Sequence, residues 1–521
     1  MFGSPWKEMF KALNHSLCCF ALVILLCPSF MAQKKSSENT KKPALIRIKQ
    51  AESLSYDEFK NNARILRGNV ICEHEGALLY CDTAYIYEKE NRMQASGHVL
   101  ITQGDSIRVT AEKLIYDGKS KMASLQNNVR CVEKDMVLTT PSMDFDLGNS
   151  IASYYNGGTI VNQKNTLTSK HGHYYSSSKE ACFNLDVVLT NPDYTMNSDT
   201  LKYRIPNKTV YFLGPSIIMA KTDYIYCENG WYDTNKEISR FSKNAVLVTA
   251  QQKLRGDSLV YDRLNKTGKA FNNVTMIDTA EKSILFGDLA EYSEKSNEAW
   301  ISGKAIYARI MEKDTLFLAA ELLYQKDLDS VNNLVLAYHR VRLLHKQMQA
   351  KADSASYNTK DSLLHFYYAP VLWTKLSQAS AKNMNATVGK NSIREFRLEG
   401  QALLLQQVDS LRTDKYNQLS GKTITGVLSQ DTIRKVTVNG NVEVLYFPKN
   451  NNKYMGLNNT SCNEAVLWFK NNEVERVSLK PKTSGALKPL KEVDVPNARL
   501  KGFNWQYTSR PKTKSDLHSV N

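Results

Sequence analysis

Two groups of side chains in this 521-residue sequence could carry chemistry: a close histidine pair and a recurring set of acids. His171 and His173 have no carboxylate or cysteine beside them at zinc-like spacing, so we predict surface residues and no metal site. The acids recur at one place in successive segments and are Asp82, Glu112, Asp199, Asp257, Asp288 and Asp353. Because catalysis needs one site and not six, we predict a turn-capping or strand-start role over calcium binding or glycoside cleavage.

The cysteines after residue 33 give no sign of a metal or disulfide framework. They are Cys72, Cys81, Cys131, Cys182, Cys227 and Cys462, without CxxC spacing. Buried thiols that act as small apolar side chains are the expectation. The sequence also contains no nucleophile elbow, phosphate-binding loop or zinc-peptidase motif. We therefore predict a protein that is not an enzyme and needs no cofactor.

A repeat dominates the elements around these residues. The stretch ASGHVLITQGD (95–105) returns as GNVICEHEG (68–76) and NNVRCVEKD (127–135). The residues equivalent to Val70 are Val99, Val129, Thr159, Val187, Ser216, Ala245, Val274, Ala305, Val341, Val371, Gln401 and Val442. Ten of the twelve intervals lie between 28 and 31 residues, which indicates a repeat architecture.

Each repeat is expected to supply two or three β-strands of four to seven residues. The segments are rich in Val, Ile, Thr and Tyr, are separated by turns such as GKSK (118–121), and show no helical period. Positions 0 and +2 are apolar and +1 is often polar, as in Val129, Arg130 and Cys131, so one face is buried. We predict an all-β, elongated solenoid-like stack with an apolar interior; strand direction and whether the interior is packed or open stay undetermined.

The first residues and the charge bear on location. Lys7 and Lys11 precede an apolar run of about ten residues (17–26) and a small-residue step at Ala32, the pattern of a cleaved signal peptide. The formal net charge is +16 at pH 7. For an exported chain this favours anionic lipid, glycan or phosphate as partner over nucleic acid, although a solvated basic surface explains the charge equally well.

These strand motifs, with "A-[DE]-x-[LA]-x-Y" as in AEKLIY (111–116), the return MQASGHV (93–99) and the signal peptide, resemble the OstA-like proteins. That family includes the periplasmic lipopolysaccharide transport protein LptA and the N-terminal domain of the translocon LptD. The resemblance is clearest over 64–310 and fainter to about 480.

The resemblance implies a β-jellyroll of two facing sheets open along one edge, whose interior carries the acyl chains of lipid A in the periplasm. It implies partners among other lipopolysaccharide transport proteins at the inner and outer membranes, joined by end-to-end strand addition, and leaves association with the outer membrane open. The groove-lining positions carried onto this sequence are Val70, Cys72, Val99, Ile101, Val129, Cys131, Val274 and Met276.

The expected organisation is a signal peptide (1–32), a linker (33–63), OstA-like repeats (64–310), more divergent repeats (311–480) and a basic tail (481–521). The repeats exceed those of a single LptA-type unit, and only about forty residues follow residue 480, which favours a bridge over a membrane pore. Two other classes stay open: a non-catalytic structural β-solenoid of the cell envelope with a fully packed interior, and, less favoured, a polysaccharide-cleaving β-helix enzyme.

Overall fold

The computed structural model describes residues 46–519 apart from short gaps at 58–62, 75–76, 104–106, 134–135, 163, 193, 221–222, 250–251, 280–281, 294, 312–313, 330–331, 347, 375, 389–392, 410–411, 430–431, 451–452, 471–472 and 482. The expected signal peptide (1–32) and the first part of the expected linker therefore lie outside the described residues. Among the described residues, no helix is long and apolar enough to cross a membrane.

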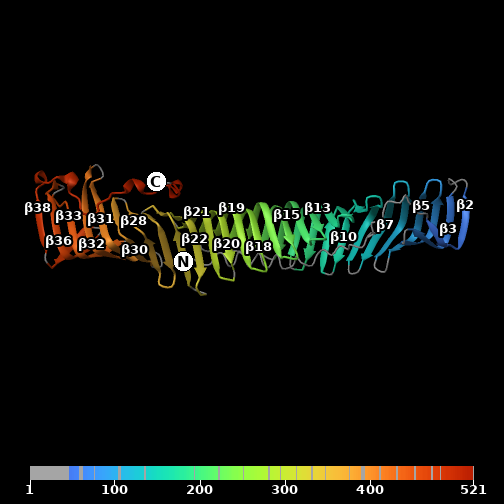
Figure 1. Cartoon of the computed structure of the whole chain (residues 1–521), viewed down its shortest axis with the longest axis horizontal. Coiled ribbons are helices and arrows are strands. Elements are labelled where there is room, and N and C mark those ends of the chain that lie inside the picture. Colours follow the sequence, from blue (N-terminus) through green and yellow to red (C-terminus); the bar gives the residue numbers. More distant parts are fainter. Residues whose placement is uncertain are drawn as a thin grey trace, which may run out of the picture. The chain divides into compact units, whose positions relative to one another are not determined.

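The chain divides into two compact units, with the division passing through β18 (Gln252–Asp262). Its described residues place the N-terminal unit within 46–249 and 256–266. Figure 1 shows its strands following one another in chain order. They are β1 (Arg47–Gln50), β2 (Ser53–Asp57), β3 (Ala63–His74), β4 (Ala77–Tyr87), β5 (Arg92–Gln103), β6 (Ile107–Asp117), β7 (Met122–Glu133), β8 (Met136–Asp146), β9 (Ile151–Tyr154), β10 (Gly158–Asn162), β11 (Asn165–Ser169), β12 (His171–Tyr175), β13 (Glu180–Asn191), β14 (Tyr194–Arg204), β15 (Thr209–Ala220), β16 (Asp223–Asp233) and β17 (Ile238–Val248).

The C-terminal unit contains 251–255 and 267–521 and is also a ladder of strands. They are β19 (Thr267–Asp278), β20 (Ser283–Ser293), β21 (Glu298–Ile310), β22 (Thr315–Asp327), β23 (Asn333–Tyr338), β24 (Val341–Leu344), β25 (Gln349–Ala352), β26 (Ser354–Asn358), β27 (Leu363–Tyr367), β28 (Val371–Trp373), β29 (Ser377–Ser380), β30 (Asn383–Val388), β31 (Ile393–Asp409), β32 (Arg412–Ser429), β33 (Thr432–Tyr446), β34 (Lys449–Asn450), β35 (Lys453–Tyr454), β36 (Leu457–Lys470), β37 (Glu473–Lys480) and β38 (Ser484–Lys488). Four 3-10 turns follow: η2 (Leu490–Glu492), η3 (Val495–Asn497), η4 (Tyr507–Ser509) and η5 (Lys514–Leu517).

Neighbouring strands pair antiparallel, for example β5 with β4 and β6, and this settles the direction that the sequence left open. The repeated motif lies in the middle of a strand and does not begin one. In β5, Gly97 and His98 have φ of 76° and 44°, and the register shifts between Ser96 and Val99. Two consecutive residues with positive φ form a β-bulge, which bends the strand without ending it. The predicted strands of four to seven residues are therefore wrong for β3 to β8 and β13 to β17, where the bulge joins two such pieces into strands of 11 or 12 residues, and hold for shorter strands such as β9 to β12.

The acids of the recurring set lie beside the bulges, so the expected turn-capping or strand-start role is also wrong. Asp82 in β4 faces the bulge of β5, where its Oδ2 is 2.8 Å from His98 Nδ1. Glu112 in β6 accepts a hydrogen bond of 2.6 Å from Asn128 in the bulge of β7. At both of these bends an acid supplies an acceptor for the polar bulge residue of the next strand.

Each bulge divides the ladder into two arms that face each other. We call arm A the part that contains Met93 and Ala95, before the bulge of β5, and arm B the part that contains Val99, after it. Apolar residues of both arms belong to one buried cluster in the N-terminal unit. The alternation read from the sequence therefore points its apolar side between the arms, and the expected β-jellyroll with an apolar interior is confirmed.

Most of the repeat positions fall directly after a bulge, but three are one residue out of register. The residues that follow the positive-φ positions are Gly158, Pro370 and Ala402 in place of Thr159, Val371 and Gln401. The cause is local. Gly157 and Gly158 form the bend at the first of these sites. At the other two sites the bulges contain Tyr368 and Gln401 and lack the Gly-Asn pair found in other bulges. A one-residue slip places a side chain on the opposite face of the sheet.

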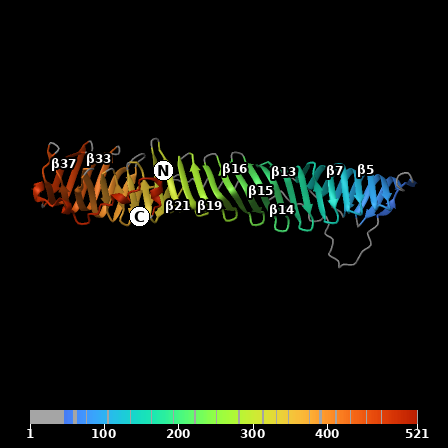
Figure 2. The same ribbon diagram turned by 90° about the horizontal axis from the view of Figure 1, so that it is seen from above.

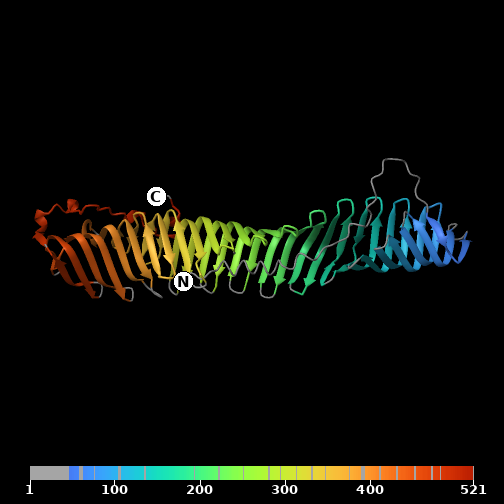
Figure 3. The ribbon, with the colours of Figure 1, turned by 60° about the horizontal axis from the view of Figure 1, so that its bottom comes forward.

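Residues 489–519, which we call the strap, run back along the C-terminal unit after β38 (Figure 3). Near β31 to β36 they pack on a cluster that includes Leu405 and Phe447. At the far end Leu517 is 2% exposed and packs with Ile306 and Ala319. The stretch expected as a basic tail thus contains a short strand and a packed segment (Figure 2).

Candidate functional site

Six of the eight predicted groove-lining residues meet inside the N-terminal unit. Val70, Cys72, Val99, Val129 and Cys131 belong to one buried cluster, and Ile101 packs against it half-buried. The other two, Val274 and Met276, lie in β19 of the C-terminal unit and are each 1% exposed. The first and third residues after these bulges point inward, as the sequence pattern predicts. Their role as the lining of a lipid groove stays a prediction.

The interior of the N-terminal unit is tightly filled. Leu66 and Leu125 are fully buried, and Val129 is 1% exposed, so side chains from the two arms cover one another. Burial raises the pKa of the Cys131 thiol to about 11 and that of Cys81 to about 12. A thiol with such a pKa remains protonated at neutral pH and behaves as a small apolar side chain. This confirms the expectation for these two cysteines.

The C-terminal unit holds a cavity of about 870 Å³ between its arms. Leu398 and Val436 line it from arm A, and Leu404, Leu419 and Val444 line it from arm B. No Asp, Glu, Lys or Arg is among its lining residues in the part of the chain that the structure describes. A large cavity with apolar walls and few polar groups is suited to an apolar ligand.

The cavity exists because the strands of this region are longer. β31 and β32 have 17 and 18 residues, compared with 12 in β5. Longer arms add inward positions such as Gln406 beyond the level of Leu404 and Val444, which are themselves only half-buried. Polar groups follow toward the end of arm B, where Asn417 Nδ2 donates to Gln406 Oε1 over 3.1 Å. The walls therefore change from apolar to polar along arm B.

Lysines lie at the end of arm B beyond these amides. Lys415 is two residues from Asn417 on the same strand, and its Nζ is 5.9 Å from the ring centroid of Tyr454. Lys449 Nζ is 4.6 Å from the same ring centroid. Asp414 lies 3.4 Å from Lys415 Nζ. The end of arm B thus carries positive charge held beside an aromatic face.

The strap covers the outer side of arm B and not the cavity. Leu403 and Leu405 alternate with the inward Leu404, so arm B of this region has apolar side chains on both faces. Two buried glutamines attach the strap, because each side-chain amide donates to a backbone carbonyl of the strap and accepts from a backbone N–H of it. Gln418 Nε2 donates to Ala498 O over 2.7 Å, and Gln418 Oε1 accepts from Leu500 N over 2.8 Å.

Gln378 repeats this arrangement further along the strap. Its Nε2 donates to Asn504 O over 2.6 Å, and its Oε1 accepts from Gln506 N over 2.7 Å. Gln378 and Gln418 are 1% and 2% exposed. Sequence reasoning missed both the cavity and the strap; the 41-residue interval between Gln401 and Val442 was the available signal for longer strands in this region.

The histidine pair lies on β12, where His173 Nδ1 is 3.0 Å from Ser153 Oγ. Burial, with the neighbouring His171 as a second cause, lowers the pKa of His173. In the described part of the chain, no group of three or more His, Cys, Asp or Glu residues could hold a metal ion.

Residues 43–199 and 207–306 match the family model described as OstA-like protein. The chain belongs to the OstA-like family through these residues. The search of curated proteins found no match.

Among solved structures, the OstA-like chain is similar to the crystal structure of LptH from Pseudomonas aeruginosa. That protein is described as the LptA homologous periplasmic component of the conserved lipopolysaccharide transport device. The identity is 15%, the alignment covers 27% of this chain and 95% of LptH, and the TM-score is 0.21. The cavity-lining residues from 348 to 479 lie beyond the part that the family model matches.

Proposed function

We propose that this OstA-like protein is a periplasmic bridge protein of lipopolysaccharide transport and holds the acyl chains of lipid A between its arms. The observation that carries the proposal is the cavity of about 870 Å³ whose described lining includes no charged side chain. Acyl chains gain about 0.8 kcal/mol per buried CH₂, so an apolar cavity of this size favours them strongly. The exposed Lys449 beside Tyr454 is suited to meet a headgroup phosphate.

The eight positions of the sequence prediction are part of the same proposal. In the N-terminal unit Val99 and Val129 are 1% exposed, so an acyl chain reaches them only when the two arms separate. The lining of the C-terminal cavity is already accessible. Cargo binding is therefore expected first at Leu419 and Val444 and, with opening of the arms, at the positions around Val129.

Edge strands support association with partners by strand addition. Among the described residues, β37 and β38 pair only with β36, and all five residues of β38 are exposed. At the other end, β2 pairs only with β3, and Leu54 and Tyr56 are 60% and 58% exposed. Unpaired edges that expose backbone groups and apolar side chains accept a strand from another chain. Other lipopolysaccharide transport proteins at the two membranes are the proposed partners.

A binding experiment with a matched pair of variants tests the proposal. Leu419→Glu places a carboxylate in the uncharged cavity, whereas Ser420→Glu places the same group on the opposite face of arm B. Binding of lipopolysaccharide to the purified mature protein should weaken at least tenfold in Leu419→Glu and remain unchanged in Ser420→Glu. Equal binding by both variants and the original chain would exclude the cavity as the acyl site.

The alternative is a structural β-solenoid of the cell envelope, and the filled interior of the N-terminal unit favours it. Such a protein should bind no lipopolysaccharide under the same conditions, and both variants should affect only its stability.

A further inference from the structure

The repeat is interrupted at one bend of the N-terminal unit. Elsewhere a strand such as β7 passes through its bulge without a break, but here β9 ends at Tyr154 and β10 begins at Gly158. On the next strand, Lys170 separates β11 from β12.

Close packing holds this interruption in place. Tyr154 is 4% exposed, and its Oη is 2.7 Å from Ser169 Oγ. A Cβ atom at Gly158 would lie 2.5 Å from the Tyr154 ring, and one at Gly172 would also overlap it. The Tyr154 ring therefore fits only because positions 158 and 172 are glycines without a side chain. This packing fixes the shape of the bend.

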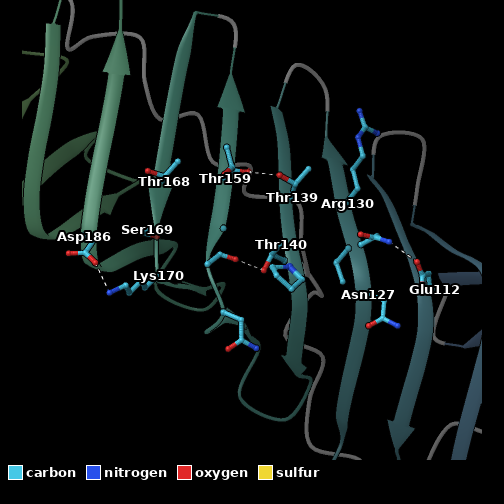
Figure 4. A pocket seen from close by; sticks show the side chains of 16 residues that line it. Glu112, Asn127, Arg130, Thr139, Thr140, Thr159, Thr168, Ser169, Lys170 and Asp186 are labelled. Atoms are coloured by element: carbon cyan, nitrogen blue, oxygen red, sulfur yellow. Dashed lines mark hydrogen bonds and ion pairs between the residues drawn. The ribbon is translucent and has the colours of Figure 1, made fainter.

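The bend creates an open cleft of about 1020 Å³ (Figure 4). A row of outward polar side chains crosses four strands at one level, because Arg130 pairs in register with Thr139, Thr139 with Thr159, and Thr159 with Thr168. The remaining lining is mainly amide, hydroxyl and glycine. The cleft offers many hydrogen-bonding groups together with a comparable amount of apolar surface.

Of the four charged residues in the described lining of the cleft, two neutralise each other. Glu112 accepts a hydrogen bond from Asn128, and Lys170 forms an ion pair of 2.6 Å with Asp186 (Figure 4). Arg130 forms no ion pair with any residue that the structure describes.

Aromatic residues are the chain neighbours of two lining residues of the cleft: Tyr155 precedes Asn156, and His171 follows Lys170. The ring of Tyr155, which is 50% exposed, lies 5.6 Å from that of His171 and 5.3 Å from that of His173. Tyr175 continues the group at 6.3 Å from His173. We call Tyr155, His171, His173 and Tyr175 the aromatic shelf.

We propose that the cleft and the aromatic shelf together bind a glycan. A sugar ring has a face of C–H groups that packs on an aromatic ring and a rim of hydroxyls that pair with amide and threonine side chains. The site thus recognises saccharide whether it belongs to an envelope glycolipid or to a cell-wall glycan strand. It is separate from the acyl cavity, and the inference does not rest on the proposed function.

Other ligand classes fit less well. An acyl chain would cover the amides and hydroxyls of the lining without replacing their hydrogen bonds to water. A peptide strand needs an unpaired edge, but β8, β10 and β11 each pair with neighbours. A nucleic acid needs a row of cations, and the cleft has only Arg130 and the paired Lys170.

Calorimetric titration of the purified mature chain tests the proposal with two soluble probes. One is the oligosaccharide obtained by complete deacylation of lipopolysaccharide, and the other is N-acetylchitotetraose. The variants are Tyr155→Ala on the shelf and Thr159→Val in the cleft, with Tyr338→Ala as a control at a 38% exposed tyrosine of the C-terminal unit. Circular dichroism confirms that each variant is folded.

At least one probe should bind saturably, and both site variants should weaken that binding at least tenfold while Tyr338→Ala leaves it unchanged. Binding of the deacylated oligosaccharide alone would identify the sugar part of a glycolipid, and binding of N-acetylchitotetraose alone would identify a cell-wall strand. Absence of saturable binding by either probe, or equal binding by Tyr155→Ala, Thr159→Val and the original chain, would overturn the proposal. Because neither probe has acyl chains, these outcomes are independent of the acyl cavity.

Discussion

The attachment of the strap by Gln418 allows a quantitative prediction. Replacing Gln418 by alanine removes two hydrogen bonds, from Nε2 to Ala498 O and from Leu500 N to Oε1, at a site that is 2% exposed. Each neutral hydrogen bond contributes about 0.5–1.5 kcal/mol, and a buried unpaired group adds to the loss. We expect a loss of about 2–3 kcal/mol in the local stability of the strap, which is roughly a 30- to 150-fold increase in its opening.

Hydrogen exchange measured by mass spectrometry reports this opening directly, because local unfolding exposes strap amides such as Leu500 and Gln506. The matched control is Gln406→Ala, since Gln406 is an exposed glutamine on the inward side of the same arm. Exchange of the strap should accelerate in Gln418→Ala and stay unchanged in Gln406→Ala. If exchange remained at its original rate in Gln418→Ala, the side chain would not hold the strap and the reasoning would fail.

Three further predictions concern the N-terminal unit. Burial raises the pKa of Cys131 to about 11, so its thiolate fraction at pH 8 is on the order of 0.1%. Iodoacetamide should therefore label the half-buried Cys182 before Cys131, which peptide mass mapping can show. Equal labelling of the two cysteines in the folded protein would contradict this. Gly97→Ala adds a Cβ atom beside Asp82 to a residue with φ of 76° and should lower the free energy of unfolding by about 1–3 kcal/mol. The control Gly148→Ala, in a turn, should have little effect. Equal melting temperatures of the two variants would argue against the bulge geometry. Hydrogen bonding to Lys202 is the main cause that lowers the folded pKa of Glu180. The resulting stabilisation is fully present above the unfolded pKa and is lost as pH falls from there through the folded pKa. Melting curves at pH 7 and pH 3 should therefore differ less in Glu180→Gln, and an unchanged difference would exclude this contribution.

The sequence was sufficient for the repeat and for the inward face because both follow from local patterns. Alternation around Val129 and Cys131 and the 30-residue spacing directly encode a buried side on successive strands. The strand boundaries were wrong because a Gly-Asn or Asn-Asn pair signals a turn and a bulge equally well. Only pairing with the next strand shows that the chain continues.

The cavity and the strap depend on contacts between distant residues, which the repeat pattern does not contain. Gln378 and Gln418 look like ordinary surface glutamines in the sequence, and their burial results from a segment more than 80 residues later. The polar cleft was missed for a related reason: Tyr154 and Gly172 are apart in sequence, and only the fold places the ring against the glycine.

In-cell photocrosslinking tests the central claim most directly. A photoreactive residue replaces Leu419 or Val444 inside the C-terminal cavity, and Ser420 or Glu443 on the opposite face of the same strands provides the control. A second set uses Val129 and Cys131 against Arg130 in the N-terminal unit. The account predicts lipopolysaccharide adducts at the inward positions and none at the outward ones. Absence of adducts at every inward position of a folded, exported protein would contradict it and favour a structural solenoid.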